Sequence, residues 1–248
     1  LNLVRAACAE CACVVVTVYV NPTQFAPHED FQRYPRNLDH DLQLLKTVGQ
    51  VLVFAPTDAE MYPAGFQTTV EVSQLSQGFE GELRPTHFRG VATVVTKLFT
   101  AVDADYAYFG QKDFQQLRVV QQLACDLNLR TTVRPCPTTR DADGLAMSSR
   151  NRYLTPTERE QGLSLSRALG IAAEMVKRGE TNVAELEGAM RDTLAAAGLK
   201  PDYAAVVDRE TLQPLAQLTR PAVALIAAKV GKTRLIDNML LDAKPREI

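Results

Sequence analysis

Residues 106–117 decide the fold, and they read YAYFGQKDFQQL. A short apolar strand runs into Gly110, Lys112 and Asp113, and an apolar-periodic helix begins directly afterwards. This order predicts a strand–loop–helix junction at the carboxyl end of a strand, where open α/β sheets bind their ligands. There Gly110 allows close backbone approach, Lys112 offers a positive charge to a phosphate, and the helix N-terminus favours anions. Gln116 lies one turn into the helix and can point back to the same place. The alternative is a solvated turn with an ordinary surface lysine.

A second strand end is predicted at residues 13–25, which read CVVVTVYVNPTQF. The residues from Cys13 to Val20 are nearly all β-branched or apolar, which is typical of a fully buried parallel strand. Pro22 ends the strand, because it cannot donate to a ladder and it restricts Asn21. Asn21 and Gln24 then present amides at the carboxyl end of the strand. Such amides suit a small substrate that carries a carboxylate or hydroxyl groups.

A third segment, residues 143–151, reads DGLAMSSRN. Ser148, Ser149 and Arg150 place two hydroxyls and a guanidinium in consecutive positions, next to the apolar Leu145 and Met147. Hydroxyls and a planar fork of five donors are what a polyphosphate needs when it leaves during nucleotide transfer. A polar loop with no binding role is the alternative.

The first part of the chain alternates between the two kinds of element, which predicts a Rossmann-like, doubly wound parallel sheet. We expect strands at 13–20, 51–54, 68–72, 106–109 and 131–134, and helices at 37–48, 90–102 and 113–127. The connection at 73–89 is long and rich in Gly, Pro and charge, and connections of that length in a compact domain are usually functional or flexible. It contains Arg84 and His87.

The second part of the chain, after residue 138, predicts a smaller α+β domain. Thr155 begins a helix as its N-cap, with Glu158 placed for a capping box, and that helix runs to Gly179. Another helix runs from Asn182 to near Gly198. Three strands, which we expect to be antiparallel, follow at about 203–207, 222–229 and 233–237. We therefore expect a nucleotide- and substrate-binding domain at 1–138 and a lid domain at 139–248.

Composition excludes several classes of protein. The chain has 248 residues, a net charge of −2 and a pI near 6.0, so we expect no nucleic-acid partner. No apolar run approaches the roughly 20 residues of a membrane span. Five cysteines argue against a disulfide framework and favour a reducing cytoplasm. We interpret the cluster Cys8, Cys11 and Cys13 as packing rather than zinc binding, and residues 39–41 (Asp-His-Asp) as a helix start. We therefore expect no metal held by the protein alone.

Taken together, these segments resemble the pantothenate synthetase family, the ligases that join pantoate to β-alanine. Family motifs occur in order at 21–25, 84–88, 110–117 and 143–154, and the likeness extends from Leu1 to residues 235–238. The resemblance implies a fold of the nucleotidyltransferase type, with ATP and Mg²⁺ but no tightly bound cofactor. It implies that pantoate is adenylated and that β-alanine then captures the pantoyl-adenylate, giving pantothenate, AMP and pyrophosphate for coenzyme A synthesis. It also implies a cytoplasmic homodimer.

The same resemblance implies the site residues. Lys112 and Arg150 would be catalytic, as the groups that neutralise the triphosphate. The ATP-binding set would be Gly110, Gln111, Lys112, Asp113, Thr139 (through its backbone, to adenine), Met147, Ser148, Ser149 and Arg150. The set for pantoate and β-alanine would be Gln24, Gln116, Asn21, Arg84 and His87.

Two departures from the family pattern bear on activity. First, the family carries a Met-Gly-x-Leu-His-x-Gly-His segment, whose histidines contact ATP phosphates, and this segment and the first strand of the sheet would lie before Leu1. Second, Gln111 stands where family members often carry Glu. A truncated chain accounts for the first departure, and we expect the chain as given to be severely impaired in catalysis. The alternatives are a non-catalytic module that binds nucleotide or pantoate, a nucleotidyltransferase with a different acceptor, and a structural homologue.

Overall fold

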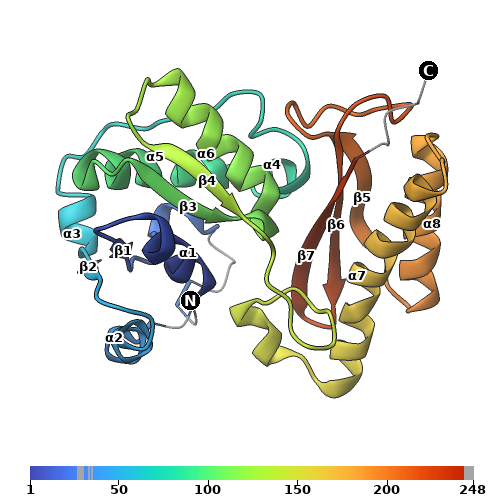
Figure 1. Cartoon of the computed structure of the whole chain (residues 1–248), viewed down its shortest axis with the longest axis horizontal. Helices are drawn as coiled ribbons and strands as arrows, with labels where there is room; N and C mark the ends of the chain where they lie inside the picture. The colour runs from blue at the N-terminus through green and yellow to red at the C-terminus, as the bar shows by residue number, and fades with distance from the viewer. Residues whose placement is uncertain (27–30, 33, 35, 243–248) are drawn as a thin grey trace. The chain divides into compact units, whose positions relative to one another are not determined.

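The computed structural model describes residues 1–26, 31, 32, 34 and 36–242 (Figure 1). The chain divides into two compact units, Leu1–Pro137 and Thr138–Ile248. No helix in the described part of the chain is both long enough and apolar enough to cross a lipid bilayer.

The first unit is an α/β unit whose strands all pair in parallel. β1 pairs with β2, with Val15 opposite Leu52, and β3 pairs with β4, with Tyr106 opposite Thr132. The elements, in chain order, are α1 (Asn2–Glu10), β1 (Val15–Thr17), the 3-10 turn η1 (Pro22–Gln24), α2 (Leu38–Lys46), β2 (Leu52–Phe54), α3 (Asp58–Met61), α4 (Phe79–Leu83), α5 (His87–Val102), β3 (Tyr106–Gly110), the 3-10 turn η2 (Gln111–Asp113), α6 (Phe114–Asp126) and β4 (Thr132–Cys136).

Helices cover both faces of β3. Successive strand residues point to opposite faces; the hydroxyl of Tyr108 donates to Glu10 at the end of α1, whereas the ring of Phe109 packs edge-on against Phe99 of α5. α5 and α6 lie together over β3 and β4 in Figure 1. This arrangement confirms the doubly wound α/β class, with its parallel ladders formed by the pairs β1–β2 and β3–β4 in the described residues.

Three predictions for the first unit were wrong in detail. The strand expected at 13–20 is only Val15–Thr17, and its residues are half-buried or exposed, because in the described residues it has a strand neighbour on one side only. Residues 68–72 form no strand, since the amide of Val70 donates to the hydroxyl of Thr93 on α5 (3.0 Å) instead of to a ladder. The connection at 73–89 holds α4 and the first turn of α5.

The second unit combines two helices with an antiparallel sheet, as predicted, and both helices lie on one face of the sheet. It contains the 3-10 turn η3 (Ser149–Tyr153), α7 (Pro156–Lys177), α8 (Val183–Ala196), β5 (Pro201–Asp208), β6 (Ala222–Val230) and β7 (Thr233–Leu241), in the sheet order β5–β6–β7. Figure 1 shows α7 and α8 packed along this sheet. The core between them is apolar and closed, with Leu169, Leu186, Met190 and Ile226 fully buried. Apolar burial of this kind is the main stabilising contribution to the unit.

The outer edge of β5 is covered by side chains from α8. Glu187 accepts the amide of Val206 (3.0 Å), and Arg191 donates to the carbonyl of Ala204 (3.0 Å). The two side chains also pair with each other at 2.8 Å. Backbone groups that would otherwise face solvent along this edge are therefore engaged.

Candidate functional site

The turn after β1 is built around the side chain of Asn21, which is 2% exposed. Its Oδ1 accepts the amide and hydroxyl of Thr23 and the hydroxyl of Tyr62, the last at 2.8 Å. Its Nδ2 donates to the carbonyl of Gly90 (3.1 Å) and to Oε1 of Gln24 (3.2 Å). The Asn21 amide is thus committed within the protein, and it fixes the Gln24 amide with Oε1 turned inward. Within the described part of the chain the Gln24 Nε2 donates no hydrogen bond, so it can donate to a ligand.

Arg84 and His87 converge on the same turn. The carbonyl of Gln24 accepts Nδ1 of His87 (2.9 Å) and Nη2 of Arg84 (3.3 Å). His87 is buried in the first turn of α5, and Arg84 stands at the end of α4, 4.0 Å from the carboxylate of Glu80. The structure therefore brings together four of the predicted residues from segments about 60 positions apart, with a buried imidazole and a guanidinium beside two amides.

The glycine–lysine loop lies at the carboxyl end of β3, as predicted. Gly110 ends the strand, η2 contains Gln111, Lys112 and Asp113, and α6 begins directly after it. Lys112 is half-buried and lies 3.9 Å from the exposed carboxylate of Asp113. In the part of the chain that the structure describes, nothing lies within 4 Å of where a Cβ of Gly110 would be, so packing against those residues does not require glycine there. Gln116 is half-buried one turn into α6.

The Ser-Ser-Arg segment forms a tight turn in the second unit. The Ser148 side chain caps η3 by accepting the amide of Arg150 (3.2 Å). Met147 is 52% exposed and its amide donates to the carbonyl of Thr139 (2.9 Å), which ties these two predicted ATP-binding positions together. Ser149 is exposed and Arg150 is half-buried. An exposed hydroxyl beside a half-buried guanidinium is suited to anion binding.

Two arginines brace this turn from within the second unit. Arg140 makes a bidentate pair with the buried Asp237 of β7, at 2.6 and 3.0 Å. Arg159 of α7 donates to both Asp141 and Asp143, and its hydrogen bonds hold the pKa of the Asp143 carboxyl below its usual value. The backbone that leads into Ser148 is thereby fixed to the sheet and to α7.

Sequence reasoning missed two residues that hold these groups in place. Tyr62 donates to Asn21 across 41 positions, and burial raises the pKa of its hydroxyl, which keeps the proton that it donates. Gln115, beside the predicted Gln116, is 4% exposed and bonds to the backbone near Glu80. A glutamine between the apolar Phe114 and Leu117 was the available signal for a buried polar position.

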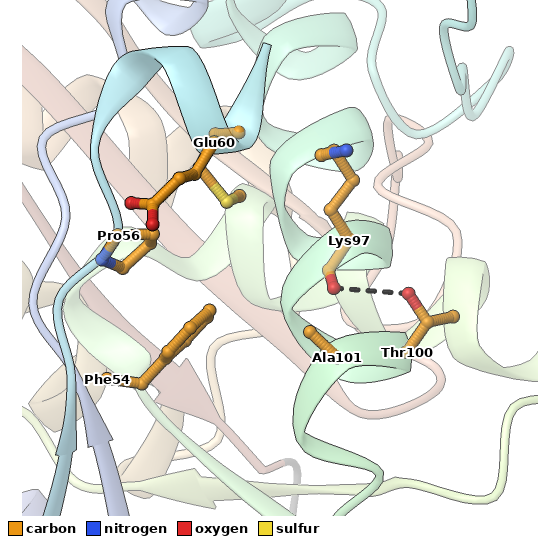
Figure 2. Close-up of a pocket in the computed structure, with 7 residues that line it drawn as sticks. Phe54, Pro56, Glu60, Lys97, Thr100 and Ala101 are labelled. Carbon is orange, nitrogen blue, oxygen red and sulfur yellow. Dashed lines mark hydrogen bonds between the residues drawn. The ribbon is translucent and has the colours of Figure 1, made fainter. Parts of the chain in front are cut away.

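A hollow of about 340 Å³ lies elsewhere in the first unit (Figure 2). Phe54, Pro56, Glu60, Met61, Lys97, Thr100 and Ala101 line it, and none of these is a predicted site residue. The Glu60 carboxylate is occupied in the capping box of α3, and the hydroxyl of Thr100 donates to the carbonyl of Lys97 one turn back in α5. The Glu60 carboxylate and the Thr100 hydroxyl therefore serve their own helices, and the Lys97 ammonium lies over the ring of Phe66.

Among residues 1–26, 31, 32, 34 and 36–242 there is no group of three or more His, Cys, Asp or Glu side chains placed to hold a metal ion. The five cysteines are free thiols. Residues 39–41 lie at the start of α2, whose N-cap is Asn37, so they form a helix start as predicted.

The parallel α/β unit, with ligand-suited loops at its strand ends, is consistent with a fold of the nucleotidyltransferase type. Residues 1–240 match the sequence model of one family, described as pantoate-beta-alanine ligase. The chain belongs to this family.

Individual relatives agree with this assignment. The pantothenate synthetase of Thermotoga neapolitana is 49% identical over 97% of this chain and 86% of its own length. A crystal structure of pantothenate synthetase from Thermus thermophilus superimposes with a TM-score of 0.92 at 46% identity, covering 96% of this chain and 86% of that one. A pantoate-beta-alanine ligase from Francisella tularensis, described as complexed with beta-gamma ATP and beta-alanine, gives a TM-score of 0.75 at 33% identity, covering 96% and 83% of the two chains.

Proposed function

We propose that this chain uses ATP to join pantoate to β-alanine, releasing pantothenate, AMP and pyrophosphate through a pantoyl-adenylate. The family match over residues 1–240 carries this proposal. The cluster around Gln24 supports it, because it supplies the hydrogen-bond donors that a hydroxy acid requires. The Francisella protein, described with an ATP compound and β-alanine, supports two of the three substrates.

Pantoate, in this proposal, binds beside the turn that follows β1. Gln24 offers its Nε2 to a pantoate oxygen while Asn21 holds its Oε1 at 3.2 Å. Arg84 and His87 fix the backbone of the same turn, and the Arg84 guanidinium adds positive charge near the carboxylate. Gln116 contributes a further amide from α6.

From the family resemblance, we propose two groups of ATP-binding residues, one in each unit. Gly110, Gln111, Lys112 and Asp113 form the first group, and Thr139 and residues 147–150 form the second. A pantoate carboxylate oxygen attacks the α-phosphorus, the bond to the bridging oxygen of pyrophosphate breaks, and that oxygen takes the electron pair. This step needs charge neutralisation more than proton transfer. Lys112 and Arg150 supply it, with the hydroxyls of Ser148 and Ser149 as donors.

Magnesium would be carried by the nucleotide. The described residues offer no three-ligand set, and Mg²⁺ commonly keeps several waters and binds substrate phosphates with few protein ligands. When bound it would neutralise phosphate charge.

The second step requires little beyond alignment. The amine of β-alanine attacks the acyl carbon of the adenylate, AMP leaves with the bridging oxygen, and the amine loses a proton to water. Because the adenylate is already activated, holding a neutral amine against it accounts for most of the acceleration.

The test measures AMP release by this chain with ATP, pantoate and β-alanine, and with each omitted in turn. In a chain extended by the family's N-terminal histidine segment, Lys112→Ala should lower adenylation about 10²–10³-fold, while pantoate affinity, measured by calorimetry, stays close to that of the same chain with Lys112. Binding of pantoate and ATP without any AMP release would favour the alternative, a module that binds its ligands without turning them over.

We also infer a homodimer, from the family, and a cytoplasmic location, from five free thiols that suit a reducing compartment.

A further inference from the structure

The side chain of Gln115 is buried and saturated with backbone partners. Its Nε2 donates to the carbonyls of Leu75 (3.0 Å), Gln77 (3.1 Å) and Gly78 (3.3 Å). Its Oε1 accepts the amide of Glu80 (3.0 Å). One side chain on α6 therefore holds a segment that lies 35 to 40 positions earlier in the sequence.

That segment has backbone features that an external partner can stabilise. Gly78 and Phe79 both have positive φ, +67° and +45°, and the second is uncommon for a residue with a side chain. Gly78 is also the N-cap of α4 and has no side chain with which to cap it. Gln115 takes that role from another helix, since the Glu80 amide in the first turn of α4 donates to it.

α4 leads directly to the cluster around Gln24. Its end places Arg84, which donates to the carbonyl of Gln24, and the next turn begins α5 at His87. On α6, Gln115 follows Lys112 of the glycine–lysine loop by three positions. The same residue is thus fixed to the loop assigned to phosphate and to the helix that places Arg84.

We propose that Gln115 is a positioning residue, which sets α4 and with it Arg84 relative to the pantoate-binding turn. This inference rests on the proposed function, in that it assigns the Gln24 cluster to pantoate. Gln115 itself does not contact the substrate. Its loss should weaken pantoate binding far more than ATP binding, because the loop at 110–113 is held by α6 and β3 independently.

Two variants of the full chain separate the two roles of the amide. Gln115→Met keeps the length and removes every hydrogen bond, whereas Gln115→Glu keeps the acceptor for Glu80 and loses the donors. Gln122→Ala is the control, because Gln122 lies on the same helix and its side chain donates to Asp126 of that helix, in an exposed bond. Each variant is first shown to be folded by circular dichroism.

Calorimetry with pantoate and with ATP, and amide hydrogen exchange, supply the readouts. In Gln115→Met, pantoate affinity should fall about 10- to 100-fold, because a displaced binding group no longer meets its ligand in the right geometry, with ATP affinity near that of the unaltered chain. Exchange at residues 78–84 should rise in both variants and remain unchanged in Gln122→Ala.

Three outcomes would overturn the inference: unchanged pantoate affinity in a folded variant, equal weakening of both ligands, or failure of both variants to fold, which would make Gln115 a general stability element. An unaltered chain that binds neither ligand would instead refute the proposed function. In that case exchange at residues 78–84 still decides whether Gln115 sets α4.

Discussion

Asp237→Asn tests whether the pair between Arg140 and Asp237 secures the segment that leads to the Ser-Ser-Arg turn. The Asp237 side chain is 3% exposed and accepts both terminal nitrogens of Arg140, whose side chain is 26% exposed. Asparagine keeps the size but replaces one acceptor oxygen with a donor and removes the charge. The guanidinium is then left partly buried beside a neutral amide.

The magnitude follows from the burial of the two partners. Breaking a buried ion pair on one side typically costs about 3–5 kcal/mol. Because about a quarter of the Arg140 side chain reaches solvent, which recovers part of this energy, we expect a loss of about 2–3 kcal/mol. For a chain of this size the melting midpoint should then fall by roughly 5–10 °C.

Differential scanning calorimetry at neutral pH measures the effect. The matched control is Glu160→Gln, which removes a carboxylate from the pair with Arg167, where both side chains are more than half exposed; its midpoint should hardly move. If Asp237→Asn melted at the same temperature as the unaltered chain, the pair would be no brace, and the reasoning from burial would be wrong.

Gly90→Ala should weaken pantoate binding about 10- to 100-fold, because the added Cβ would lie 2.4 Å from the carbonyl oxygen of Thr23. Gly170→Ala is the control, because its Cβ would meet none of the described residues within 4 Å, and equal pantoate affinities of the two variants by calorimetry would contradict the prediction. Asp143→Asn should lower the urea concentration at the unfolding midpoint at neutral pH, because Arg159 lowers the pKa of Asp143 in the folded state. The difference in midpoint between the variant and the unaltered chain should shrink as pH falls below about 4, and a difference independent of pH would count against this. Light scattering should give a molar mass of twice the 27.3 kDa of one chain, and a mass of 27.3 kDa would refute the dimer.

Local signals predicted the second unit well. Thr155 and Glu158 form the capping box that begins α7, and the three strands pair antiparallel, as expected. Helix caps and the alternation of buried and exposed strand residues depend on a few consecutive residues, so they can be predicted from the sequence alone. The loop at 110–113 was also predicted, because the change from strand to helix occurs within one short stretch.

Features that depend on distant partners were not predicted. The run at 13–20 is apolar enough for a buried strand, but burial depends on which neighbours a strand has, and composition does not record them. Asn21 was expected to present its amide to a substrate, whereas the structure commits that amide to Gly90 and Gln24. Tyr62 and Gln115 form hydrogen bonds with residues 41 and 35 positions away, and hydrogen bonds over such separations produce no periodic pattern in the sequence.

The covering of the β5 edge by Glu187 and Arg191 has a consequence for how the chain reaches its folded state. Until α8 docks, the amide of Val206 and the carbonyl of Ala204 are open, and an exposed strand edge is a template for pairing with another chain. Docking of α8 therefore completes the apolar core and, in the same step, covers part of one strand edge at which two partly folded chains could pair. Aggregation during refolding should depend on how quickly this helix settles, and dilute conditions that give it time should raise the yield of folded chains.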